Sequence, residues 1–253
     1  MPDWIYRGEG YDGGKYDPDK FQVDLYAKFL ADYLELMHDN GVRIDYLSPS
    51  KEWSQVITSE KASRVILLLR NECRRRKVPM PKIVGPASWS VNGGINDLKG
   101  IKELGHASLY AGFCTHRHNN SGSEKNVRKF AELAHSMGKR AFDDESSLGG
   151  GGRTHGEEPE FQKLLDSYSQ RSAAYRAGLS GELFFENWSR GIDSETRSIY
   201  FKKGGVARRL RAHYVFLDFA ASTKDGWYVP VELQKPDKNL ETMAFWKGNR
   251  LTV

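Results

Sequence analysis

Two glutamates in the sequence have the type and the setting needed for acid–base chemistry. Glu52 and Glu145 each follow a predicted strand directly, and each lies in a polar stretch. Retaining cleavage of a glycosidic bond needs two carboxyl groups about 5–5.5 Å apart, one as the nucleophile and the other as acid and then base. We therefore expect a sugar hydrolase with Glu52 and Glu145 as its catalytic pair.

Other side chains that a sugar site uses also lie just after predicted strands. Aromatic rings can stack on the apolar faces of pyranose rings, and polar groups can bond the hydroxyls. The aromatic candidates are Trp53, Trp89 and Trp188. The polar candidates are His116, His118, Asn119, Arg153 and Asn187.

Two other functions remain open on the same residues. His116 and His118, with Asp143 and Asp144, are suitable metal ligands for a metal-dependent hydrolase, although paired histidines more often form hydrogen bonds. The glycine-rich segment 149–156 is typical of either a mobile lid or a linker, so a carbohydrate-binding remnant without activity is the second alternative. The expected site contains neither a metal nor another cofactor.

The elements that would position these residues alternate between helix and strand. Residues 21–40 have apolar side chains at helical spacing and end at Gly41, whereas residues 42–47 alternate with period two. This order recurs along the chain. The other predicted helices are 59–77, 96–105, 124–137, 161–177 and 206–221, and the other strands are 82–86, 108–114, 140–143 and 182–185.

This alternation predicts an α/β fold with a parallel sheet. A doubly wound nucleotide-binding sheet would show a glycine-rich motif after a strand, and none is present. Polar residues collect after the strands instead, which favours a (β/α)₈ TIM barrel. Five predicted strands make that barrel incomplete, so we expect about three further βα units ahead of residue 1. Residues 1–223 would form the partial barrel, and residues 224–253, with antiparallel strands at 226–233 and 241–246, would begin a small β-domain.

Composition excludes several classes of protein. With 39% hydrophobic and 12% aromatic residues, the chain is not a disordered segment. The net charge of +5 comes from short basic patches at 74–77 and 208–211 that fit solvated helix faces, so no nucleic-acid partner is expected. The longest aliphatic string is residues 65–69, and we expect no membrane partner. The two cysteines have no metal-site spacing.

Two segments resemble motifs of the retaining glycoside hydrolases with (β/α)₈ barrels, the clan that contains families 5, 30, 39 and 86. Residues 44–53, IDYLSPSKEW, resemble its fourth-strand motif, and residues 139–146, KRAFDDES, resemble its seventh. The resemblance covers nearly the whole chain. Residues 242–253 resemble the start of the β-domain that follows the barrel in families 30, 39 and 86.

The resemblance implies a role for each matched residue. Glu52 would be the acid/base and Glu145 the nucleophile, while His116 matches a histidine or tyrosine near the nucleophile and Trp188 an aromatic at the scissile bond. Lys51 stands where the clan usually has asparagine, which suggests contact with a sulfate or uronate group. The resemblance leans towards the family 86 agarases and porphyranases, and it implies a secreted or periplasmic enzyme acting on a polysaccharide.

Overall fold

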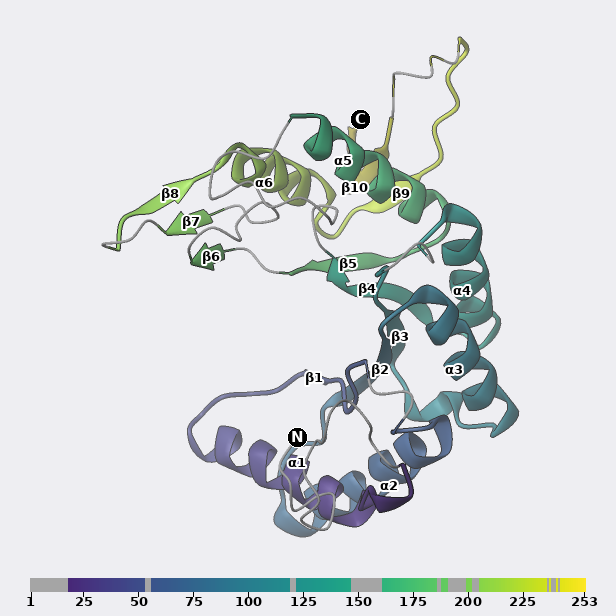
Figure 1. Ribbon diagram of the computed structural model, residues 1–253, viewed down its shortest axis with the longest axis vertical. Coiled ribbons are helices and arrows are strands. Elements are labelled where there is room, and N and C mark those ends of the chain that lie inside the picture. The colour runs from purple at the N-terminus through teal and green to yellow at the C-terminus, as the bar shows by residue number, and fades with distance from the viewer. Residues whose placement is uncertain are drawn as a thin grey trace. The chain divides into compact units, whose positions relative to one another are not determined.

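The structure is a computed structural model with two compact units, Met1–Asp144 and Glu145–Val253 (Figure 1). It describes residues 18–52, 56–118, 122–146, 161–185, 188–190, 199–201, 205–235, 237, 240 and 242–253. None of the helices in these ranges is long and apolar enough to cross a membrane.

The first unit alternates helix and strand, as predicted. A short 3₁₀ turn, η2 (Pro18–Lys20), precedes the first helix, and a second, η3 (Ala107–Leu109), precedes β3. The helices are α1 (Val23–Asp39), α2 (Ser59–Arg76), α3 (Val91–Glu103) and α4 (Glu124–Ser136). The strands are β1 (Tyr46–Leu47), β2 (Lys82–Ser88), β3 (Gly112–Thr115) and β4 (Arg140–Ser146). Each strand pairs in parallel with the next, and α2, α3 and α4 lie on the same side of the sheet (Figure 1).

Local sequence signals explain where these helices begin and end. The hydroxyls of Thr58, Ser90 and Ser123 accept hydrogen bonds from backbone N–H groups in the first turns of α2, α3 and α4. Gly41 and Gly138 follow α1 and α4 with φ of +74° and +69°, which glycine adopts without strain. The aliphatic string 65–69 gives α2 its buried face, through Val65, Ile66 and Leu69.

The second unit contains the remaining elements. These are α5 (Phe161–Arg176), β5 (Gly181–Phe184), β6 (Trp188–Arg190), β7 (Ile199–Phe201), β8 (Ala207–Arg209), α6 (Arg211–Thr223), β9 (Trp227–Val229), β10 (Ala244–Lys247) and β11 (Arg250–Thr252). Strands β6, β7 and β8 form one small sheet, and β9, β10 and β11 form a second, antiparallel one.

The predicted five-stranded sheet is confirmed, with the order β1-β2-β3-β4-β5. The division between the units falls within β4. Residues 140–143 of β4 pair with β3, and beyond the division the N–H of Phe185, directly after β5, donates to the carbonyl of Ser146 at 2.6 Å. Sequential order along the sheet is what an incomplete (β/α)₈ barrel requires.

Several predicted boundaries were wrong. The strand expected at 42–47 is only Tyr46–Leu47, and α3 begins at residue 91 rather than 96 because Ser90 caps it. The helix expected from 206 begins at Arg211, since residues 207–209 form β8 and Leu210 is extended. The antiparallel C-terminal strands are confirmed, with β11 as an additional partner. A domain boundary at 223/224 stays a prediction.

Candidate active site

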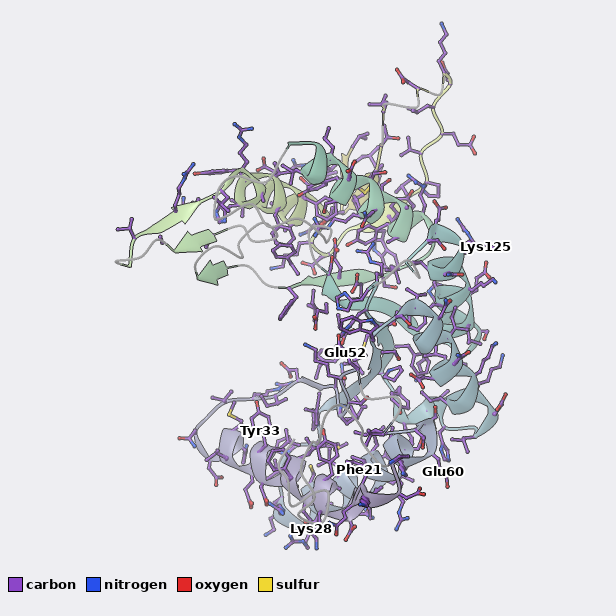
Figure 2. The ribbon with its side chains drawn as sticks, viewed as in Figure 1. Phe21, Lys28, Tyr33, Glu52, Glu60 and Lys125 are labelled. Carbon is purple, nitrogen blue, oxygen red and sulfur yellow. The ribbon has the colours of Figure 1, made fainter. Side chains whose placement is uncertain are left out.

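Glu52 lies beside the carboxyl end of β2 (Figure 2). Its backbone N–H donates a hydrogen bond to the carbonyl of Ala87, the second-last residue of that strand, at 2.8 Å. The preceding residues are anchored as well, because the Ser50 hydroxyl donates to Pro86 O and the Tyr26 hydroxyl donates to Pro49 O, both at 2.8 Å. The loop after β1 is therefore fixed against the neighbouring strand.

The backbone of Glu52 is strained. Its φ of +58° is in the left-handed region, which costs an L-residue about 1–2 kcal/mol. Strain of this kind persists only where surrounding contacts hold it, and it concentrates at functional sites. The hydrogen bonds of residues 49–52 provide such contacts.

His116 fixes the Glu52 carboxylate. The ring Nδ1 lies 2.7 Å from Glu52 Oε1, a hydrogen-bond distance. The ring is only 1% exposed, whereas the Glu52 side chain is 23% exposed. The backbone N–H of His116 donates to Ser88 O at 2.8 Å, which places the residue directly after β3. An ionised carboxylate can only accept, so the proton in this bond then resides on Nδ1.

Asp144 lies on the other side of the same imidazole. Its Oδ1 is 3.6 Å from His116 Nε2, beyond hydrogen-bond distance but close enough for electrostatic attraction to a protonated ring. Burial raises the pKa of Asp144, an effect that His116 opposes. Burial also raises the pKa of the neighbouring Cys114 thiol well above its usual value, so this cysteine is not a candidate nucleophile. His116 thus has a carboxyl group at each ring nitrogen.

A second histidine and a tryptophan extend the cluster. His118 Nε2 lies 3.5 Å from Glu52 Oε1, and the rings of His118 and Trp89 have centroids 4.5 Å apart. Trp89 follows β2 and is exposed. The first unit therefore brings together four of the predicted site residues: Glu52, Trp89, His116 and His118.

The contacts of Asp143 bear on the metal alternative. Its buried carboxylate accepts from Arg117 Nε at 2.5 Å, so one of the four suggested metal ligands already has a cationic partner. The 2.7 Å contact of His116 with Glu52 is also a hydrogen bond, whereas two ligands of one zinc ion would each point at the ion from about 2 Å. These contacts fit hydrogen-bonding roles for the histidines, but Glu52, His116 and His118 also place ligand atoms within 4.8 Å of one another, close enough to share a metal ion.

The other predicted residues are placed as follows. Lys51 is exposed beside Glu52. Glu145 is in the last part of β4, directly after Asp144, and is the first residue of the second unit. Trp188 begins β6. Trp53, Asn119, Arg153 and Asn187 lie outside the described residues.

Sequence reasoning missed two polar contacts in this region. Asp144 was considered only as a metal ligand, although it faces His116. The Ser88 hydroxyl donates to Asp97 Oδ2 at 2.6 Å, and burial raises the pKa of that carboxyl. Asp97 is on α3, and its position within a helical pattern gave no sign that it would reach back to the end of β2.

Comparisons with known proteins agree with the fold. No protein-family model matches the sequence, and no curated protein matches it significantly. The catalytic domain of the GH30 xylanase C from Talaromyces cellulolyticus has a similar structure, with a TM-score of 0.69 and 13% identity. That match covers 96% of this chain and 58% of the xylanase domain, so the chain spans little more than half of its length.

A second similar structure is one of two fungal β-1,4-galactanases, with a TM-score of 0.52 and 14% identity. It covers 81% of this chain and 70% of the galactanase. At such identities the similarity establishes the fold and leaves function to the site. The chain has the α/β fold of these glycoside hydrolase catalytic domains.

Proposed function

We propose that this chain carries the catalytic residues of a retaining glycoside hydrolase that acts on a polysaccharide. The observation that supports this most strongly is the hydrogen bond between Glu52 and the buried His116, at the carboxyl ends of parallel strands. Active sites of barrel enzymes lie at that end of the strands. The partly exposed carboxylate is held by His116 and lies 3.5 Å from His118, whose ring contacts that of Trp89. These are the properties of an acid/base in a sugar site.

The proposed reaction has two steps. Glu145 attacks the anomeric carbon while the leaving glycosidic oxygen takes a proton from Glu52, which gives a glycosyl-enzyme and releases the first product. Glu52 then removes a proton from water, the resulting hydroxide attacks the same carbon, and Glu145 leaves as a carboxylate. Retention requires the two carboxyl groups to lie about 5–5.5 Å apart during the reaction.

His116 would position Glu52 in both steps. When Glu52 is ionised, Nδ1–H donates to its Oε1 and orients the carboxylate. When Glu52 carries the catalytic proton, that proton can lie on the other oxygen, towards the substrate. Asp144 Oδ1 lies 3.6 Å from Nε2, at the other ring nitrogen from Glu52. Trp89 and Trp188 would stack on sugar rings, and His118, Asn119, Arg153 and Asn187 would bond hydroxyls.

Substitution of the two glutamates tests the proposal. Glu145→Gln should abolish turnover, because the nucleophile is lost. Glu52→Gln should lose activity on polysaccharides but retain turnover of aryl glycosides with good leaving groups, which need no protonation. Glu60→Gln is the matched control, since Glu60 is an exposed carboxylate on α2 in the same unit (Figure 2). Near-parental rates in Glu145→Gln would refute the assignment.

The substrate is a separate part of the proposal. The two similar structures are a xylanase and a galactanase, so xylan and β-1,4-galactan are suitable first substrates. Agarose and porphyran test the narrower expectation of a family 86-type galactan hydrolase, which neither similar structure supports. If Lys51 binds a sulfate or uronate, Lys51→Asn should reduce the preference for sulfated over desulfated substrate. An unchanged preference would contradict this role.

A further inference from the structure

The small sheet β9–β10–β11 has a row of exposed apolar side chains across its three strands. Trp227 on β9 pairs directly with Trp246 on β10, and Trp246 pairs directly with Leu251 on β11. Residues that pair directly across antiparallel strands project from the same face of a sheet. All three side chains are well exposed: Trp227 by 71%, Trp246 by 46% and Leu251 by 48%.

The opposite face of this sheet already has its apolar partners. Phe245, next to Trp246, is buried, and its ring centroid lies 5.4 Å from that of Tyr175, 6.1 Å from that of Phe219 and 5.8 Å from that of Tyr228. Alternate residues of a strand point to opposite faces, so the tryptophan row is on the side away from this aromatic core. The sheet therefore packs onto α5 and α6 through the face that carries Phe245, and Trp227 and Trp246 lie on the opposite face.

We propose that Trp227 and Trp246 form a carbohydrate-binding platform outside the catalytic site, on which a polysaccharide chain stacks. The ligand class rests on the proposed function. Neighbouring strands are about 4.8 Å apart, so two indoles in register lie side by side at a spacing comparable to one sugar residue in an extended chain. Indole rings suit this ligand because the axial C–H groups of a pyranose form an apolar face.

The size of the row favours a polysaccharide over a protein partner. From their exposed fractions, the two tryptophans present about 300 Å² of surface, if a whole tryptophan side chain offers about 250 Å². A stable protein–protein interface needs about 800 Å² from each partner. A surface of this area can be covered by two or three sugar rings, whereas the two tryptophans alone supply less than half of what a second copy of the chain would bury.

Binding of the full 253-residue chain to insoluble xylan, β-1,4-galactan and agarose tests the proposal by co-sedimentation. We expect the parent to bind at least one of them, and Trp227→Ala and Trp246→Ala each to weaken binding about fivefold, as the loss of one stacking contact implies. The double variant should weaken it further, whereas Trp227→Phe should retain more binding than Trp227→Ala. Tyr214→Ala is the matched control, because Tyr214 is an exposed aromatic residue on α6.

The outcomes separate this proposal from the catalytic one. Parental binding by the double alanine variant, or no binding by the folded parent to any of the three polysaccharides, would overturn the platform. Self-association of the parent that the double variant loses would also overturn it, in favour of a protein interface. Glu60→Gln, on α2 of the first unit, should bind like the parent. If the tryptophan variants lose binding while no variant or parent hydrolyses the polymer, the platform stands and the proposed enzyme activity fails.

Discussion

Glu52 combines a strained backbone with a partly buried hydrogen bond to His116, and these two contributions to stability have opposite signs. Glycine at this position would stabilise the fold by about 1–2 kcal/mol, because it removes the left-handed strain. It would also destabilise the fold by about 0.4–1 kcal/mol, because glycine increases the entropy of the unfolded chain. The net gain from glycine is about 0.5–1 kcal/mol. Against it stands the hydrogen bond to His116, worth about 1.5–3 kcal/mol because one partner is charged.

Glu52→Gly should therefore change sign with the background. In the parent chain it removes both the strain and the hydrogen bond, and the free energy of unfolding should fall by about 1–2 kcal/mol. In a His116→Ala chain the hydrogen bond is already absent. The same substitution should then raise the free energy of unfolding by about 0.5–1 kcal/mol.

Urea unfolding of the four chains measures both effects. Lys77→Gly is the matched control, because Lys77 also has a left-handed φ of +59° but is exposed at the end of α2. Lys77→Gly should stabilise the parent and the His116→Ala chain equally. The urea transition that it shifts is the unfolding of the first unit. A Glu52→Gly effect of the same sign and size in both backgrounds would refute the coupling between Glu52 and His116.

Three further predictions concern other buried groups. Arg171→Met should lower the free energy of unfolding of the second unit by about 3–5 kcal/mol in thermal unfolding, because the buried Glu182 carboxylate, 2.8 Å from Arg171 Nε, loses this cation. Adding Glu182→Gln should recover much of that stability. A double variant no more stable than Arg171→Met would contradict the pair. Gly94→Ala should destabilise α3 by about 1–3 kcal/mol, because the new Cβ would lie only 2.7–2.9 Å from atoms of the Thr115 side chain. Gly93→Ala is the control: its Cβ would lie 3.4 Å or more from its neighbours, so it should stabilise the helix by up to about 1 kcal/mol. Equal effects of the two substitutions in urea unfolding would contradict the prediction. Burial raises the pKa of Asp144, so the folded state keeps its proton to higher pH than the unfolded state, and stability is lost as pH rises from about 4 through the raised pKa. Asp144→Asn removes that loss, and its stability relative to the parent, measured at pH 3.5 and pH 7, should be greater at pH 7; equal differences would contradict the shift.

Much of the fold was predictable because its signals are local. The five strands of the sheet lie between helices with clear apolar faces, and several of those helices begin or end at capping residues. Strands β6, β7 and β8 were not predicted; each has three residues, fewer than the four over which period-two alternation can be read. The same limit explains why Ala207–Arg209 was assigned to the start of α6.

Sequence reasoning selected four residues that lie together in the first unit, but it did not predict the contacts between them. Polar residues after parallel strands identified Glu52 and His116, because the carboxyl ends of such strands lie at one edge of a sheet. Their hydrogen bond joins residues 64 positions apart and depends on a left-handed turn at a glutamate, where sequence rules would expect glycine or asparagine. No local pattern predicts a conformation that the local residue disfavours.

That disagreement between local preference and structure is itself an argument for the site. Among the described residues, four that are not glycine have a positive φ: Glu52, Lys77, Ala87 and Asp225. Lys77 and Asp225 are exposed, at the ends of α2 and α6, where such conformations are common. Glu52 and Ala87 are instead joined to each other by a backbone hydrogen bond. Two strained residues in contact, one carrying a carboxylate held by a buried histidine, support the proposed site independently of any similarity in fold.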